Sequence, residues 1–294
     1  MSMFRWLAAV VAVGCLTVAV SAAEKKRLLL VTDSGGFIHD SVGLSEQILK
    51  KIGPDYGFTV ECYRFTRDPE NTKVFDEYAA RFRKTTGVAV EKENCGRVNA
   101  ETLKKFDCVL FFTTGNPLNE QEVKDLVAWV KAGGAVAGTH CGSDTLYPSK
   151  DRPWNAGYGE LIGAYFDGHP WHQKIKLKVE DAEHAAGKSF KDGDEITDEI
   201  YQFRPEPYNR GKLHIIMSVD NSSIDTKKGK RSDNDYAVSW CREVEKGRTF
   251  YTSLGHRKEV WNDKRFQEHL FGGLNWAVKN ASGSAAPSGE LKPK

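Results

Sequence analysis

The sequence has almost no net charge, and this shortage excludes several kinds of partner. Its 294 residues include 42 Lys and Arg against 40 Asp and Glu, which leaves a formal net charge of +2. A balanced charge provides no general attraction to nucleic acid or to an anionic membrane, so we expect neither as a partner. Hydrophobic residues make up 40% of the chain, enough to bury a globular core. The partner must therefore be inferred from local sites.

Long apolar runs are also lacking, apart from one at the N-terminus. There, Arg5 precedes an apolar run that extends to Val20, and small residues follow it up to Ala23. This pattern is typical of a secretory signal over residues 1–23, cleaved near Ala22 or Ala23. A retained membrane anchor is the alternative, but the run is shorter than the roughly 20 apolar residues of a spanning helix. We therefore expect an exported protein, periplasmic or secreted.

Cysteines are few, and no two of them form a CxxC pair. That absence argues against a thiolate zinc site and a thioredoxin-like centre. Export permits disulfides, and Cys62 and Cys95 flank a charged segment, so we expect these two to form a bridge. Cys108 lies inside an apolar run and is expected to be an inert buried thiol. The glycine pairs fit neither a phosphate loop nor a dinucleotide fingerprint, so no nucleotide cofactor is predicted.

Short apolar runs that fit buried strands alternate with amphipathic helical patterns in the first half of the chain. Strands are predicted over residues 28–32, 58–62, 108–113 and 135–139, and helices over 41–51 and 119–132. This alternation indicates βαβ units and a parallel sheet with helices on both faces. Further strands are predicted over 173–179, 214–219, 237–240 and 248–253, and a final helix over 264–278. No linker interrupts this pattern, so we expect one α/β domain over 24–280 and a disordered tail over 281–294.

Three histidines follow predicted strands, at the edge where open α/β sheets bind ligands. His140 directly ends the fourth predicted strand, His256 follows the last one, and His39 lies in the loop after the first. Imidazoles that meet at one sheet edge suit a metal ion, an acid–base pair or a polar sugar. Asp33, at the start of the His39 loop, is a candidate substrate contact.

Two further motifs bring polar groups close to predicted strands. His169 and His172 stand just before the strand over 173–179, and a carboxylate pair that includes Glu199 precedes Tyr201. A carboxylate beside an aromatic side chain can serve as a ligand or as a base. A charge pair at the edge of a strand is the alternative interpretation.

The motif around His140 approximates a nucleophile elbow. In several hydrolases and in glutamine amidotransferases, a sharp turn after a strand carries the nucleophile between two glycines. His140 stands nearer the centre of the motif over 138–142, and Cys141 is displaced from it by one residue. We therefore predict that Cys141 is dispensable. A Cys141-dependent amidotransferase or hydrolase is the alternative.

Six short motifs follow one another at residues 135–140, 166–170, 198–201, 247–251, 254–256 and 272–277. In this order they resemble the ThuA-like, or trehalose-utilisation, family, and the resemblance covers about residues 27–279. It implies a flavodoxin-like, three-layer sandwich with a mostly parallel sheet, related to the class I glutamine amidotransferases. In that fold His140 takes the place of the amidotransferase cysteine. The resemblance also implies a role in disaccharide catabolism, after a sugar has been oxidised to its 3-keto form.

We therefore expect a carbohydrate-processing protein that acts on a keto-sugar or a modified disaccharide. His140 and His256 are predicted to bind a divalent metal, either zinc, manganese or iron(II), with His39 or Glu199 completing the ligand set. A metal-held keto group acidifies the neighbouring proton, so Glu199 or His169 is predicted to move protons. The reaction would be an isomerisation, or an elimination or hydrolysis of the glycosidic group.

Two aromatic residues near these motifs are candidates to stack on the sugar. They are Trp171 and Tyr201, and a place in the buried core is the alternative for either. A small-molecule carbohydrate is the expected partner. A non-catalytic carbohydrate-binding protein on the same fold is the alternative function.

Overall fold

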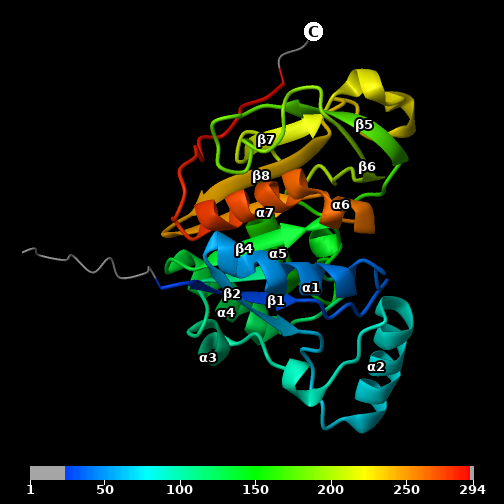
Figure 1. The fold of residues 1–294 in the computed structure, drawn as a ribbon, viewed down its shortest axis with the longest axis vertical. Coiled ribbons are helices and arrows are strands. Elements are labelled where there is room, and N and C mark those ends of the chain that lie inside the picture. Colours follow the sequence, from blue (N-terminus) through cyan, green and yellow to red (C-terminus); the bar gives the residue numbers. More distant parts are fainter. Residues whose placement is uncertain (1–23, 292–294) are drawn as a thin grey trace, which may run out of the picture.

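A nine-stranded sheet organises the part of the chain that the computed structural model describes, residues 24–291 (Figure 1). The strand order is β2-β1-β3-β4-β9-β8-β7-β5-β6. The predicted secretory signal lies outside the described residues. Within residues 24–291, no helix is both long enough and apolar enough to span a membrane.

The first five strands of this order run parallel to one another. They are β2 (Phe58–Tyr63), β1 (Lys26–Val31), β3 (Cys108–Phe111), β4 (Ala135–Thr139) and β9 (Gly247–Thr252). This is the strand order of flavodoxin-like folds. Antiparallel strands extend the sheet from β9, namely β8 (Ala237–Val244), β7 (His214–Val219), β5 (Trp171–Val179) and β6 (Glu195–Ile200). The predicted α/β fold with a mostly parallel core sheet is thus confirmed.

Helices cover both faces of the parallel strands and make the three layers. One face carries α1 (Val42–Ile52), α6 (Lys258–Asn262) and α7 (Lys264–Ala277), and the other carries α3 (Ala100–Leu103), α4 (Glu120–Lys131) and α5 (Ala156–Ile162). Side chains alternate along a strand, so Leu30 packs in the α1 and α7 layer while Leu29 packs in the α4 and α5 layer. The remaining helix, α2 (Thr72–Thr86), contacts α1 at one end of the molecule (Figure 1).

The chain enters β4 from a helix with well-defined ends. The side chain of Asn119 accepts a hydrogen bond from the backbone N–H of Glu122, and the Glu122 side chain accepts one from Asn119 in return. This reciprocal pair caps the first turn of α4. Gly133, with a φ of +126°, then turns the chain into β4. Local sequence therefore sets where β4 begins.

The expected disulfide between Cys62 and Cys95 is wrong, because both residues are free thiols. Cys62 points from β2 into the core below α1, where burial raises the pKa of its thiol to about 12. Cys95 lies beyond the end of β2, level with Phe65, and its Sγ donates to the carbonyl of Glu91 at 3.4 Å. The two cysteines flank the charged segment in sequence but stand at different levels of the sheet.

Residues 282–288 differ from the expected disordered tail. The N–H of Ile215 donates to Ser288 Oγ, and the N–H of Ser288 donates to the carbonyl of Leu213. β5 pairs with β7 only from Met217 onward, so the start of β7 has an open edge there. The tail supplies partners for these backbone groups, which its composition alone does not indicate.

Candidate functional site

Three of the predicted histidines converge at the carboxyl edge of the parallel strands. β4 and β9 are neighbours, and their last residues, Thr139 and Thr252, pair with each other. His140 follows β4 directly, His256 follows β9 after a short turn, and His39 lies in the loop after β1. The ring centroid of His140 is 4.8 Å from that of His39 and 5.2 Å from that of His256. The convergence follows from the parallel order, which brings the ends of these strands to one edge.

His140 occupies the strained turn that follows β4. Its φ is +44°, a left-handed conformation that is uncommon for a residue other than glycine. The hydroxyl of Tyr251 donates to the His140 carbonyl at 2.6 Å and holds the turn in place. His140 Nδ1 lies 3.0 Å from the carbonyl oxygen of Ser253, which can only accept, so Nδ1 carries the proton. The other ring nitrogen, Nε2, therefore directs a lone pair at the neighbouring side chains.

A network of backbone hydrogen bonds fixes the turn that carries His256. The two carboxylate oxygens of Asp198 accept the N–H groups of Gly255 at 2.7 Å and Arg257 at 3.0 Å. The indole N–H of Trp261 donates to the Gly255 carbonyl at 2.8 Å. Gly255 has a φ of +118°, a conformation that a residue with a side chain rarely adopts. His256 is thus bracketed on both sides by residues that Asp198 holds.

His39 and His256 are uncharged at neutral pH. His39 is 5% exposed, and its Nε2 lies 3.2 Å from Nε2 of His140. Burial, together with the neighbouring imidazoles, lowers the pKa of His39 to about 2 and that of His256 to about 4. Both rings therefore keep a lone pair that can bind a cation.

Glu199, from the end of β6, brings a carboxylate to the histidines. Its Oε2 is 3.4 Å from His140 Nε2, and its Oε1 is 3.9 Å from His256 Nε2. Burial acts to raise the pKa of Glu199, but the neighbouring histidines, His140 first among them, bring it below its usual value. The carboxylate is therefore ionised and supplies a negative charge in a nearly closed site.

These four residues, here called the histidine-glutamate cluster, could hold a metal ion. Its members are His39, His140, Glu199 and His256, and one ligand atom from each lies within 4.8 Å of all the others. A tetrahedral ion with ligands at about 2.1 Å separates the ligand atoms by about 3.4 Å, close to the shorter distances here. Nδ1 of His39 and Nδ1 of His256 are buried without a hydrogen-bond partner among the described residues. These are the ring nitrogens opposite the Nε2 atoms that face His140 and Glu199, so the geometry that favours a metal ion is that of the Nε2 atoms.

Two more histidines border the open side of the cluster. His172 pairs directly with Glu199 across β5 and β6, and its Nε2 is 3.0 Å from Glu199 Oε1. His169 Nδ1 is 3.4 Å from the same oxygen. Their side chains are 46% and 51% exposed, in contrast to the buried cluster. The sequence placed His172 among the candidate histidines but indicated no role for it, because its position opposite Glu199 depends on a strand pairing that no local pattern indicates.

The two predicted stacking residues differ in their positions. Tyr201 lies in the site, with its hydroxyl 3.1 Å from His140 Nε2, but it is only 3% exposed and presents no open face. Trp171 lies outside the site, since its indole N–H donates to the carbonyl of Asp225 and the residue is 1% exposed. Because side chains alternate along β5, Trp171 and His172 point to opposite faces. The prediction that Trp171 stacks on a sugar is therefore corrected: Trp171 lies in the core.

The predicted contact between Asp33 and a substrate is also corrected, because both oxygens of its carboxylate already have partners. One oxygen accepts the backbone N–H of Thr66 at 3.0 Å and the Thr66 hydroxyl at 2.9 Å, while the other pairs with Arg67 at 3.1 Å. The residue is 1% exposed. It joins the loop after β1 to the segment after β2 and has no free oxygen to offer a substrate.

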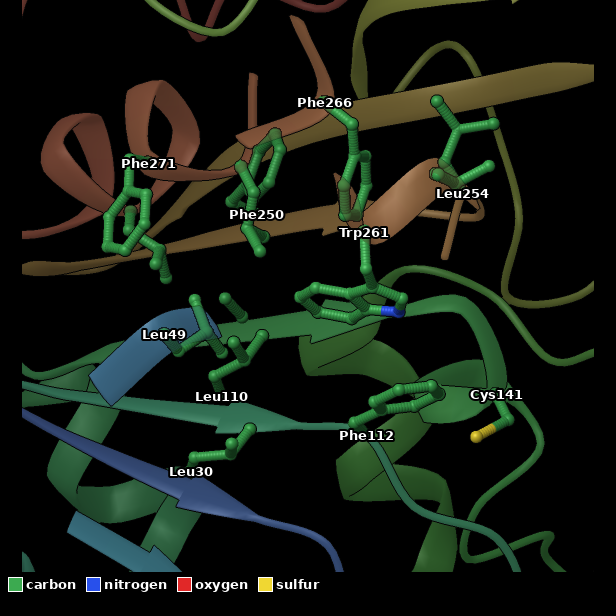
Figure 2. Close-up of a cluster of buried hydrophobic side chains, with 14 of the residues drawn as sticks. Leu30, Leu49, Leu110, Phe112, Cys141, Phe250, Leu254, Trp261, Phe266 and Phe271 are labelled. Carbon is green, nitrogen blue, oxygen red and sulfur yellow. The ribbon is translucent and has the colours of Figure 1, made fainter. Parts of the chain in front are cut away.

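Cys141 follows His140 in the sequence, but its side chain lies in the hydrophobic core. Its side chain packs in the same cluster of apolar residues as Phe112 and Trp261 (Figure 2). The residue is fully buried, and burial raises the pKa of its thiol well above the usual value. A thiol in this environment is a poor nucleophile. The structure thus places His140, and not Cys141, at the centre of the turn.

The comparisons with known proteins agree with the fold. The profile of the ThuA family, described as trehalose utilisation, matches residues 27–277. A solved structure from Bacteroides uniformis, described as a ThuA-like protein, has 18% identity and a TM-score of 0.61, and the match covers 92% of this chain and 98% of that one. Another ThuA-like protein, from Parabacteroides merdae, has 16% identity and a TM-score of 0.59 over 90% and 94% of the two chains. A search of curated proteins finds no match. The fold and the profile match over most of the chain show that this protein belongs to the ThuA family.

Proposed function

We propose that the chain is an exported, metal-dependent carbohydrate-processing protein that acts on a keto-sugar or a modified disaccharide. The description of its family, trehalose utilisation, supports the class of substrate. The observation that carries the proposal is the histidine-glutamate cluster, whose ligand atoms lie within 4.8 Å of one another. The signal-like pattern over residues 1–23 supports export.

The chemistry of the cluster favours a small group of metals. Uncharged imidazoles with one carboxylate suit zinc, manganese or iron(II). A bound ion of this kind would polarise a keto oxygen and acidify the adjacent C–H bond. The chain itself prepares the ligands, because the Ser253 carbonyl keeps the proton of His140 on Nδ1 and Asp198 holds the turn of His256.

The exposed histidines are the best candidates to transfer protons. Glu199 was expected either to complete the ligand set or to act as a base, and its place within the cluster favours the role of ligand. His169 and His172 lie beside its Oε1 but are about half exposed, so they can take up a proton and release it to water. The Glu199 carboxylate stabilises the positive charge that either imidazole gains.

A 3-keto disaccharide illustrates the reaction. His169 or His172 takes the proton from C2, and the electron pair of that C–H bond forms an enolate with the keto group. In an elimination, the electrons return to form the C1–C2 double bond, the glycosidic C1–O bond breaks, and the leaving oxygen takes the proton back from the imidazole. In an isomerisation, the imidazole instead delivers the proton to C3, while the proton of the C2 hydroxyl moves to O3, so that the keto group is transferred to C2. Both routes balance without a further reagent.

Elemental analysis of the purified mature protein tests the metal. We expect about one ion per chain in the wild type and a strong loss in His140→Ala and His256→Ala, with a smaller effect on the melting temperature. His214→Ala is the matched control, because His214 pairs with Asp181 away from the cluster. A wild-type protein without metal after growth with zinc, manganese and iron would contradict the proposal.

Deuterium exchange tests the reaction separately. In heavy water, the wild type is expected to exchange the C2 proton of 3-keto-trehalose, which proton NMR detects directly. A variant that combines His169→Ala with His172→Ala should lose this exchange while it keeps its metal. Sugar binding without any exchange, retained in His140→Ala, would instead favour a non-catalytic binding protein.

A further inference from the structure

The loop after β1 exposes an aromatic ring beside the histidine-glutamate cluster. Phe37 is 68% exposed, whereas its neighbours Ile38 and His39 are 6% and 5% exposed. Among the described residues, the other exposed large hydrophobic side chains are the aliphatic Val74 and Leu291. A single exposed apolar side chain is ordinary on a protein surface. The position of Phe37 is what distinguishes it, since its ring centroid is 4.9 Å from that of His39.

The backbone that carries Phe37 is held from two sides. The guanidinium of Arg81, on α2, donates to the carbonyl of Gly36 at 2.8 Å, and the hydroxyl of Thr114 donates to the carbonyl of Phe37 at 2.8 Å. The loop also packs tightly on the segment after β3, where a Cβ on Gly115 would approach the Gly36 nitrogen to 2.9 Å. The exposed ring therefore has a fixed base and little conformational entropy to lose on binding a ligand.

In the described part of the chain, no other aromatic residue near the cluster offers a comparable surface. Tyr201 and Trp171 are buried, and Phe166 is half-buried with its ring 4.4 Å from that of Tyr201. The polar groups of the site, His169 and the cluster, can bind hydroxyl and keto oxygens. A pyranose also has C–H groups on its ring faces, and these need an apolar partner, which in ligand sites is commonly an aromatic ring.

We propose that Phe37 is the platform on which the sugar ring packs while its oxygens face the histidine-glutamate cluster. This inference rests on the proposed function and assigns to Phe37 the stacking role that the buried Trp171 does not fill. The fixed base of the loop sets the distance between the platform and His39. The site thereby selects a ring with an apolar face, such as a pyranose, over an open-chain sugar or a small acid.

Binding measurements on the metal-loaded protein test this role. The probes are trehalose and 3-keto-trehalose, with affinity measured by titration calorimetry and metal content by elemental analysis. Phe37→Ala should weaken binding about fivefold to tenfold, the effect of one lost aromatic contact. Phe37→Tyr keeps the ring and should stay within about twofold of the wild type. Val74→Ala, which removes another exposed apolar side chain, is the matched control.

The outcomes separate the platform from the proposed function. If the wild type binds the sugar and Phe37→Ala binds it equally well, the platform is wrong and the proposed function stands. If Phe37→Ala loses metal together with sugar affinity, Phe37 acts by positioning His39, and the platform is again wrong. If the wild type binds metal but neither sugar, the carbohydrate function itself fails. Loss of sugar affinity with unchanged metal content, restored in Phe37→Tyr, supports the inference.

Discussion

His140 shows how one residue acquires a role from the backbone around it. Its left-handed φ points the ring into the site, and the Ser253 carbonyl decides which ring nitrogen faces the other ligands. Without a cation, a proton must lie between the facing Nε2 atoms of His140 and His39, which are 3.2 Å apart. In the proposed site, a metal ion would take the place of that proton and would also bind Glu199. The adjacent residue, Cys141, shares the turn but none of this environment.

Cys141→Ala should therefore leave most of the activity unchanged. The thiol lies in the hydrophobic core, so the substitution removes only a buried sulfur (Figure 2). We expect a loss of about 1 kcal/mol in the free energy of unfolding from the small cavity. Turnover of 3-keto-trehalose and urea denaturation measure the two effects. Loss of turnover with normal metal content and stability would favour a thiol nucleophile instead.

At the scale of elements, β6 uses two adjacent carboxylates for different purposes. Asp198 and Glu199 point to opposite faces of the strand, as successive residues do. Asp198 accepts the backbone N–H groups that flank His256, while Glu199 faces the histidines directly. In the proposed metal site, Asp198 would therefore position a ligand and Glu199 would supply one. The sequence left open that these adjacent carboxylates form a charge pair at the edge of a strand. Asp198 needs no cation partner, because its carboxylate already accepts two backbone N–H groups.

Asp198→Asn should weaken metal binding without removing a ligand. The amide nitrogen cannot accept the N–H that one carboxylate oxygen now accepts, so the turn of His256 loosens. Loss of a supporting contact of this kind typically lowers metal affinity about 10–100-fold. Competition with a chelator measures the affinity, and Asp55→Asn, an exposed residue next to α1, is the matched control. An unchanged affinity in Asp198→Asn would show that His256 needs no such support.

On the scale of the whole molecule, the site joins two parts of one sheet. The parallel strands provide His39, His140 and His256, whereas the antiparallel extension provides Glu199 and His172. The antiparallel extension therefore contributes side chains to the candidate site, and it also covers the edge of the parallel sheet beside β9 (Figure 1). Folding of both parts is required before any ion can bind with all four ligands.

Stability of the whole molecule should depend on pH through a buried histidine. His269, on α7, is fully buried, and burial lowers its pKa from 6.5 to about 4. The unfolded chain therefore binds more protons between these values, and the free energy of unfolding falls as the pH decreases from 6.5 to 4. This group alone contributes a loss of about 2 kcal/mol between pH 7 and pH 5.

Urea denaturation at both pH values measures this loss. His269→Gln retains a donor for the Ala186 carbonyl, which His269 Nδ1 contacts at 2.6 Å, but cannot be protonated. The variant should therefore lose about 2 kcal/mol less than the wild type over the same interval. Equal losses in the two proteins would mean that His269 is not kept neutral by the fold.

The sequence alone determined the layered fold and the strand ends that carry His39, His140 and His256. Apolar runs and helical periodicity are local, so β4 and β7 were predicted with the bounds that the structure has. The carboxyl ends of parallel strands share one edge, which made the convergence of the three histidines predictable. β6 was not predicted as a strand, because its sequence EITDEI is mostly polar and two of its buried residues are carboxylates.

Only the tertiary structure decided which side chains face the site. Pairing of β5 with β6 sets His172 opposite Glu199 and turns Trp171 into the core. Two other outcomes also depend on how distant segments pack. Thr66 occupies the carboxylate of Asp33, and the two unbridged cysteines stand at different levels of the sheet. The physical reason is that strand register and side-chain direction across a sheet are set by contacts between residues far apart in the chain, which no local pattern encodes.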